Sequence, residues 1–240
     1  MPKYSTKLRG RKEVAEGTMA FSFEKPAGFQ FKAGQFANFT LVNPPESDGE
    51  GNTRTFSIAS APAEAGLLVA TRMRDTAFKR VWKTMPQGTE LKLAGPFGSL
   101  TLHQDAARPA VFLAGGIGIT PFRSILVQAQ RDNRGRRLFL FYSNRRPEDA
   151  AFLEELQALS QQNPNFTFVG TMTGMDKSRR TWFGETGFVN QEMLGRFVGD
   201  LAAPIYYIAG PPGLVAAMQQ LLADAKVSED SIRAEEFAGY

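Results

Sequence analysis

The stretch that decides the fold of this chain is VFLAGGIGITP, residues 111–121. It continues an apolar run that starts at Ala110, and such unbroken runs are typical of strands buried on both faces of a parallel sheet. Glycines follow where a strand must turn sharply into a helix, because glycine adopts positive φ and lets other groups approach the backbone. Pro121 suits the first helical turn, where its missing N–H is not needed. The stretch therefore predicts a strand, a glycine loop and a helix, in that order.

The alternation of strand and helix continues toward the C-terminus. Further buried strands are expected at residues 137–142, 166–171 and 205–209. Helices are expected at residues 121–132, 147–161 and 211–225. Strands that alternate with helices predict a parallel sheet covered by helices on both faces. We therefore expect an α/β parallel-sheet domain over residues 105–240.

Residues 1–104 have a different pattern, in which short β-favouring runs are separated by turn signals. The expected strands cover residues 19–23, 35–41, 67–73 and 90–94, and one helix is expected at 77–85. Regular short strands with such turns predict a small antiparallel β-barrel. The polar, glycine-rich residues 46–52 are expected to form a mobile loop beside a strand that contains Arg54.

The composition limits the chemistry that the side chains can supply. With 42% hydrophobic and 22% charged residues and no apolar segment of spanning length, the chain is expected to be cytoplasmic, without membrane insertion. The absence of cysteine excludes disulfides, thiol nucleophiles and cysteine-ligated iron–sulfur clusters. The single histidine, His103, makes a His-rich metal site untenable, so we expect no metal and interpret it as a surface or packing residue. Any chemistry must come largely from a bound organic cofactor.

The charge of the chain limits the classes of partner that it is expected to bind. The net charge is +4, and basic residues cluster, for example at residues 72–80, 131–137 and 177–180. Each cluster is either a solvated surface or a region that attracts phosphate-bearing ligands or an acidic protein. No basic stripe interleaved with aromatic residues is present, so nucleic acid is not an expected partner.

Two loops of the predicted α/β domain are candidates for binding phosphates. The free N–H groups of a glycine loop at a helix N-terminus favour a pyrophosphate, and the candidate residues are Gly115, Gly116, Gly118, Thr120 and Pro121. The loop lacks the third glycine of the G-x-G-x-x-G fingerprint, so a plain turn is the alternative. A second candidate is Gly210-Pro211-Pro212, which follows the strand at 205–209 and reaches the sheet edge where ligands bind.

The segment after the second strand bears on the choice of coenzyme. Ser143, Arg145 and Arg146 are expected near the adenosine ribose of a dinucleotide. Arginine there accommodates a 2′-phosphate, which favours NADPH over NADH. The alternative is a basic loop in front of a helix.

Residues 54–57, Arg-Thr-Phe-Ser, are the main candidates in the first domain. In an extended segment Arg54 and Phe56 share one face, and Thr55 and Ser57 the other. A fixed arginine pairs with a phosphate, and an aromatic ring lies against a flat ring. A simple edge strand is the alternative. A second anion site is expected nearby, where Arg72 and Arg74 precede a helix start at Thr76, Ala77 and Phe78, although Thr76 is also an ordinary helix N-cap. Thr71 and Met73 are further candidates for binding the cofactor.

Together these segments resemble the ferredoxin–NADP reductase superfamily. Residues 54–57 are similar to its R-x-[YF]-S flavin motif, and residues 95–98, Gly-Pro-Phe-Gly, are similar to its G-P-[YF]-G segment. Residues 115–121 resemble its G-G-x-G-x-[TS]-P loop, and residues 210–212 its C-G-P-P motif, with Ala209 in place of the cysteine. The resemblance covers nearly the whole chain.

The resemblance implies roles for individual residues. Arg54 and Arg72 would face the phosphates of FAD, Phe56 would pack against the flavin and its ribityl chain, and Ser57 would approach flavin N5. The helix start at 76–78 would lie at the pyrophosphate. The tail, residues 235–240, would place Phe237 or Tyr240 over the other flavin face, unless it is a frayed polar tail. Ser57, Phe237 and Tyr240 are thus the residues expected beside the reacting atoms.

The function implied by the resemblance is an FAD-dependent NAD(P)H reductase. Hydride would pass from nicotinamide to flavin N5, and electrons would then pass to a separate, acidic carrier such as ferredoxin or flavodoxin. Three alternatives stay open: a reductase of free flavin, a ferric-siderophore reductase, and a non-catalytic flavin subunit of a larger complex.

Overall fold

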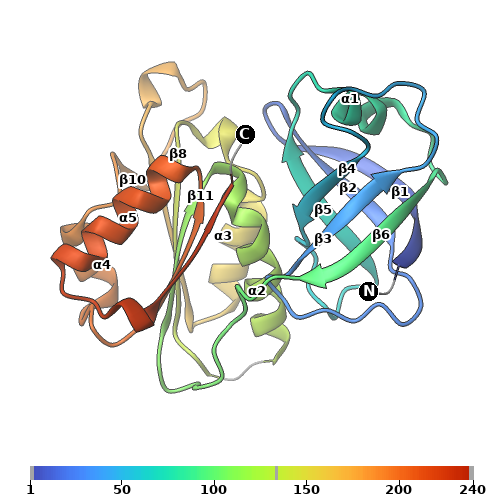
Figure 1. Ribbon diagram of the computed structural model, residues 1–240. Helices are drawn as coiled ribbons and strands as arrows, with labels where there is room; N and C mark the ends of the chain where they lie inside the picture. Colours follow the sequence, from blue (N-terminus) through green and yellow to red (C-terminus); the bar gives the residue numbers. More distant parts are fainter. Residues whose placement is uncertain (1–2, 133–134, 238–240) are drawn as a thin grey trace.

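The computed structural model describes residues 3–132 and 135–237, which form two sheets that lie side by side (Figure 1). The first is an antiparallel sheet with the strand order β4-β3-β6-β1-β2-β5. Its strands are β1 (Lys3–Ala15), β2 (Thr18–Glu24), β3 (Phe36–Leu41), β4 (Thr53–Ser57), β5 (Gly66–Arg72) and β6 (Glu90–Phe97). The outer strands β4 and β5 contact each other, so the sheet curls into a barrel, and α1 (Ala77–Thr84) lies at one end of it.

The barrel forms around an aromatic core. In β3 every second side chain is buried, which is the alternation expected of a strand with one face toward a core. Phe21, Phe23 and Phe39 point into this core and pack around Trp82 of α1. The amphipathic helix α1 thereby covers the end of the barrel and fixes the direction of its N-terminus.

The second sheet is parallel, with the strand order β10-β9-β8-β7-β11-β12. Its strands are β7 (Ala110–Gly115), β8 (Leu138–Asn144), β9 (Phe166–Met172), β10 (Glu185–Thr186), β11 (Ile205–Gly210) and β12 (Ile232–Glu236). The helices are α2 (Ile119–Asp132), α3 (Leu153–Gln162), α4 (Gln191–Val198) and α5 (Pro212–Asp224). Alternate residues of β7 and β8 pack against α2 and α3 on the face toward the barrel, and against α4 and α5 on the other.

The predicted fold class, an antiparallel barrel followed by a parallel α/β sheet, is confirmed. The expected boundary near residue 105 falls in the connection between β6 and β7. The expected helix at 147–161 differs: a short 3₁₀ turn covers Pro147–Asp149, and the α-helix begins at Leu153. Phe152 has a left-handed backbone, with φ of 60°, and this conformation separates the two pieces. No sequence pattern predicted β1, β10, β12 or α4.

Two further findings concern the described residues. None of their helices is long and apolar enough to cross a membrane. They contain no group of three or more histidine, cysteine, aspartate or glutamate side chains arranged to hold a metal ion.

Candidate functional site

A cleft of about 820 Å³ lies where the carboxyl ends of the parallel strands meet the barrel. It brings together predicted site residues from five separate segments of the chain. These residues are Arg72, Met73, Gly115, Gly116, Ser143, Arg145, Pro211 and Phe237. The carboxyl edge of an open parallel sheet is the position at which α/β domains bind ligands. The cleft is therefore the candidate functional site.

The glycine loop after β7 is held against the end of β11. A Cβ on Gly118 would lie 2.2 Å from the Ala209 carbonyl oxygen, so the close approach of the two segments requires glycine here. Gly116 has φ of 52°, a left-handed conformation that glycine adopts without strain. The Thr120 hydroxyl donates to the Ile117 carbonyl over 3.0 Å and closes the turn into α2. The loop thus places backbone groups of residues 115–117 on the cleft wall.

Several predicted residues of these loops stabilise them instead of facing the cleft. Thr120 and Pro121 are buried in the first turn of α2. Gly210 packs against Gly115, where a Cβ would lie 3.1 Å from the Gly115 nitrogen. Pro212 is the first residue of α5. Their role in the described structure is to shape the backbone at the carboxyl edge.

Arg145 and Arg146 follow β8 but have different surroundings. The exposed Arg145 lines the cleft together with Ser143. The Arg146 guanidinium lies 2.8 Å from the Asp149 carboxylate and 3.1 Å from the carboxylate of Glu16, which belongs to the barrel domain. Of the two arginines predicted to contact the coenzyme, only Arg145 lines the cleft. Arg146 instead links the two domains, because carboxylates on both sides fix it.

The N-terminus of α1 is a second anion-binding position, and a carboxylate of the chain occupies it. The Ala77 N–H donates to Asp48 Oδ2 over 2.8 Å, and this hydrogen bond is the main cause that lowers the pKa of Asp48. Arg54 lies 3.5 Å from Asp48 and 2.7 Å from Glu50. Its guanidinium also covers the Phe78 ring at 5.3 Å. The residues 46–52, expected to be a mobile loop, thus place acidic groups on the predicted phosphate-binding donors.

Lys79 belongs to the same region, although the sequence analysis placed it only in a basic cluster. It is 7% exposed, and its Nζ donates to the Arg72 carbonyl over 2.8 Å. Burial lowers its pKa to about 8, and the neighbouring Arg74 and Arg54 add to this effect. Thr76 caps the helix, since its hydroxyl accepts from the Lys79 N–H. Arg54, Arg74 and Lys79 thus concentrate positive charge beside the α1 N-terminus, and grouped charges of one sign attract ions of the other sign.

Residues 55–57 only partly match their predicted roles. The Phe56 ring is 4% exposed and stacks on Trp82 with 4.7 Å between ring centroids, so it presents no open face to a bound ring. The expectation that Phe56 packs against a flavin is not met, because the aromatic barrel core takes up its ring. Thr55 points to the other face and donates to Asn38.

Ser57 does fit the need for a polar partner at a bound ring. Its Oγ is buried and has no hydrogen-bond partner in the part of the chain that the structure describes. A buried hydroxyl without a partner is costly, and a ligand that hydrogen-bonds to it would remove this cost. Thr71, by contrast, is fully buried in β5, and its hydroxyl donates to the Arg72 carbonyl over 3.3 Å.

The C-terminal segment is ordered along the sheet. Strand β12 pairs in parallel with β11, and the Phe237 N–H donates to the Gly210 carbonyl over 2.9 Å. Phe237 lines the cleft, and the alternative of a frayed polar tail is wrong up to this residue, because the segment pairs with β11. Tyr240 lies outside the described residues. The cleft also contains Phe188, which is 79% exposed and which no sequence pattern had identified.

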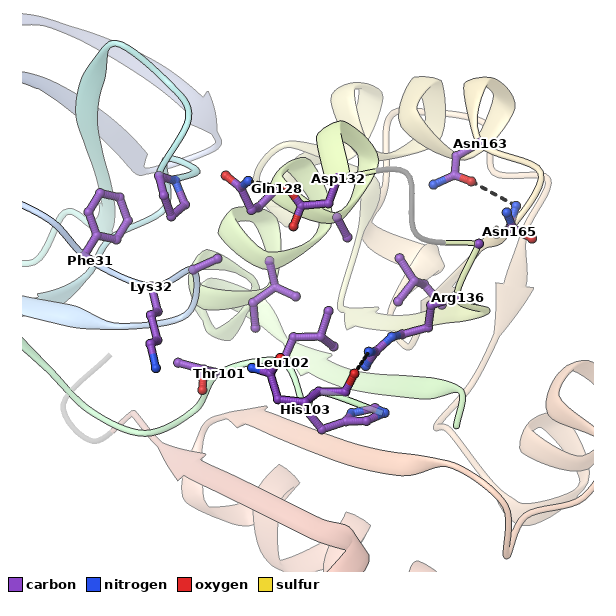
Figure 2. A pocket seen from close by; sticks show the side chains of 17 residues that line it. Phe31, Lys32, Thr101, Leu102, His103, Gln128, Asp132, Arg136, Asn163 and Asn165 are labelled. Carbon is purple, nitrogen blue, oxygen red and sulfur yellow. Dashed lines mark hydrogen bonds between the residues drawn. The ribbon is translucent and has the colours of Figure 1, made fainter. Parts of the chain in front are cut away.

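A second cavity, of about 340 Å³, lies between the barrel and α2 (Figure 2). His103 lies on its wall, with Nδ1 2.8 Å from the Tyr207 hydroxyl and Nε2 3.1 Å from the Arg108 carbonyl. Burial lowers the pKa of His103, which fits its predicted role as a packing residue. Arg136 donates to the Gln104 carbonyl over 3.2 Å. None of the predicted site residues that the structure describes lines this cavity.

The chain is similar in sequence to oxidoreductases of known function. Residues 112–220 match the model of the oxidoreductase NAD-binding domain. The chain is 29% identical over 206 residues to one component of a Na⁺-translocating NADH-quinone reductase from Klebsiella pneumoniae, with 79% of this chain and 50% of that protein covered. It is 28% identical over 218 residues to the reductase component of propane 2-monooxygenase from Rhodococcus jostii, with 89% and 57% covered. The chain thus spans about half the length of the curated relatives that it matches.

Solved structures resemble the whole chain. A ferredoxin NADP⁺ reductase from Neisseria gonorrhoeae, solved with bound FAD and NADP, has a TM-score of 0.82 and 25% identity, and 98% of this chain and 99% of that chain are covered. The FAD/NAD-binding domain of a nitric oxide dioxygenase from Vibrio cholerae shares the fold, with a TM-score of 0.84, 18% identity and 98% of each chain covered. Both domains and their order are therefore matched, and not the nucleotide domain alone.

Proposed function

Because this chain belongs to the ferredoxin–NADP reductase superfamily, we propose that it is an FAD-dependent reductase that takes electrons from NADPH or NADH and passes them to a separate acceptor. The observation that carries this proposal is the cleft between the two domains. It joins the glycine loop and Arg145 of the α/β domain to Arg72 and Met73 of the barrel. FAD, when bound, supplies a ring that accepts hydride and can release electrons one at a time.

The donor set of the barrel fits FAD. The α1 N–H groups, Arg54 and Lys79 would hold the pyrophosphate, at the position where Asp48 now accepts from the Ala77 N–H. The carboxylate at this position supports the proposal, because a carboxylate carries negative charge as a phosphate does. The unpartnered Ser57 Oγ would hydrogen-bond to the flavin ring. No proton transfer by a side chain is needed, so the contribution of these residues is binding, orientation and exclusion of water.

The α/β domain would hold the nicotinamide nucleotide. Its glycine loop presents backbone groups to the cleft beside the N-terminus of α2, a position that favours a pyrophosphate. Arg145 would face the 2′-phosphate, which supports NADPH as the preferred coenzyme. Phe237 would cover the flavin face that the nicotinamide must reach, and it would move aside when the coenzyme binds.

We propose that the acceptor is an acidic protein of the ferredoxin or flavodoxin kind. The net charge of +4 supports this, because a basic surface steers an acidic partner. The relative named as the reductase component of propane 2-monooxygenase supports a protein acceptor, without identifying one for this chain.

The deciding experiment is a visible spectrum of the purified protein, followed by anaerobic mixing with NADPH and, separately, NADH. A yellow protein that either nucleotide bleaches rapidly is the expected result, with NADPH the faster. A colourless protein that reduces only added flavin would make flavin a substrate. A yellow protein that neither nucleotide bleaches would overturn the proposed reductase activity and favour a non-catalytic flavin subunit.

A further inference from the structure

One buried arginine, which is not among the residues that line the cleft, joins the two domains. Arg123 lies on α2 and is 6% exposed. Its NH1 group donates to the Ala59 carbonyl over 2.7 Å and to Glu64 Oε2 over 3.1 Å, and both partners belong to the barrel domain. Its NH2 group donates to Glu155 Oε1 of α3 over 2.6 Å. We call these four residues the Arg123 bridge.

Neighbouring contacts strengthen the connection between the same two segments. The Ser124 hydroxyl donates to the Ser60 carbonyl over 2.6 Å. One helical turn further along α2, Gln128 accepts from the Ala63 N–H over 3.1 Å. Residues 59–64 are therefore fixed along α2, and not only at one point.

The Arg123 bridge is close in the sequence to residues on both sides of the proposed ligand site. Ala59 comes two residues after Ser57, whose buried hydroxyl has no partner among the described residues. Helix α2 starts at Ile119, directly after the glycine loop. Short, ordered segments thus connect the bridge to the flavin contact on one side and to the nucleotide loop on the other. A shift at the bridge would move one ligand site relative to the other.

The chemistry of the bridge favours a single geometry. A guanidinium has its donors in a fixed planar arrangement, which matches two carboxylates and a carbonyl oxygen more stringently than an ammonium group does. Glu64 is itself held, since Oε2 also accepts from the Ala61 N–H over 2.5 Å. A buried guanidinium that loses a hydrogen-bond partner is costly. The arrangement in which Arg123 keeps its contacts to both Glu64 and Glu155 is therefore the one of low energy.

We propose that Arg123 is a positioning residue that sets the distance between the flavin and the nicotinamide through Glu64 and Ala59. This inference rests on the proposed function. Arg123 does not line the cleft in the described structure, so it acts through the placement of the two domains. The energetic basis is that hydride transfer depends steeply on the separation of the reacting atoms.

The two carboxylates of the bridge provide a matched pair of variants. Glu64→Gln weakens a contact between the domains, whereas Glu155→Gln weakens a contact within the α/β domain, although the latter distance is shorter. We expect Glu64→Gln to slow flavin reduction at saturating NADPH about tenfold and Glu155→Gln to slow it less than twofold, since small displacements of reacting groups cost large factors in rate. FAD content and the affinity for 2′,5′-ADP should stay within twofold in both. Equal slowing by the two variants would overturn the inference.

A structural readout separates positioning from loss of folding. The chain has no cysteine, so Gln87→Cys in the barrel and Gln161→Cys in α3, both exposed positions, allow specific spin labelling. The distance distribution between the labels should be narrow in the otherwise unchanged protein and in Glu155→Gln. It should broaden in Glu64→Gln and Arg123→Met, with partial recovery in Arg123→Lys. An unchanged distribution in Arg123→Met would overturn the inference. Absence of flavin reduction in the unchanged protein would instead contradict the proposed function.

Discussion

The two regions that we propose to bind phosphates, one in the barrel and one in the α/β domain, differ in the groups that they present. In the barrel the donors are Arg54, Lys79 and the α1 N-terminus, and a carboxylate already occupies that N-terminus. In the α/β domain the glycine loop, residues 115–118, presents backbone, and Arg145 lines the same cleft. The first region therefore depends on charge, and the second on shape. Substitutions should break the two regions in different ways.

The largest effect is expected from adding a single methyl group to the glycine loop. In Gly118→Ala the new Cβ would lie 2.2 Å from the Ala209 carbonyl oxygen, and backbone cannot yield as a flexible side chain does. We expect a loss of about 3 kcal/mol or more in the free energy of unfolding, at or above the usual cost of overpacking. Denaturant unfolding and titration with 2′,5′-ADP would measure it.

Gly213→Ala is the matched control for this variant. Gly213 lines the cleft, and an added Cβ would meet no atom within 4 Å beyond its chain neighbours and the backbone of its own helix. It should retain stability and 2′,5′-ADP affinity. If Gly118→Ala behaves as Gly213→Ala does, the α/β region does not depend on the close approach of the loop to β11.

The second prediction tests the dependence of the barrel region on charge. Arg54→Ala should raise the Kd of FAD about 10- to 100-fold, because a hydrogen bond to a charged group contributes about 1.5–3 kcal/mol. Fluorescence titration of the apoprotein with FAD would measure this change. Arg80→Ala is the control, since the exposed Arg80 pairs with Glu46 and Asp75. Stoichiometric FAD retained tightly by Arg54→Ala would remove the flavin assignment of this arginine.

The third prediction uses two adjacent arginines that differ only in their partners. Arg145→Ala should raise the KM for NADPH about tenfold and leave the KM for NADH nearly unchanged, since only NADPH carries the 2′-phosphate. Arg146→Ala should leave this preference intact and lower the thermal stability, because it releases Asp149 and Glu16. Steady-state kinetics would measure the KM for NADPH and for NADH in both variants. Equal changes for the two coenzymes in Arg145→Ala would remove the reason to prefer NADPH.

Elements whose cause lies in neighbouring residues were predicted from the sequence, whereas elements that depend on distant residues were missed. The apolar run and glycines at residues 110–118 act locally, so the strand, the loop and α2 were predicted from them. Strand β1 was missed because its polar residues show no clear alternation, and its extended form comes from pairing with β2 and β6. β12, in turn, is ordered by pairing with β11, which lies far earlier in the chain.

At the site, residue type was predictable and partners were not. The sequence identified Arg145 and Arg146 alike, but Glu16, the partner of Arg146, lies 130 residues away. Phe56 was expected at a cofactor, yet its ring packs in a core formed by residues of all six barrel strands and α1. The Arg123 bridge was invisible for the same reason, since Ala59 is 64 residues distant in the sequence. Only the three-dimensional fold brings such partners together.

The smallest effect is expected from the carboxylate that occupies the α1 N-terminus. Asp48→Asn keeps an acceptor for the Ala77 N–H but removes the charge that competes with a phosphate for Arg54. We expect FAD to bind about two- to fivefold more tightly, which is the usual size of the effect of one charge at a helix end. The gain should shrink at high salt, because screening weakens exposed charges first. Asp75→Asn, at an exposed partner of Arg80, should change the FAD affinity less. Weaker FAD binding by Asp48→Asn would mean that the loop 46–52 supports the cofactor instead of competing with it. The negative charge of Asp48 would then help to hold Arg54 and the α1 N-terminus in the form that binds FAD.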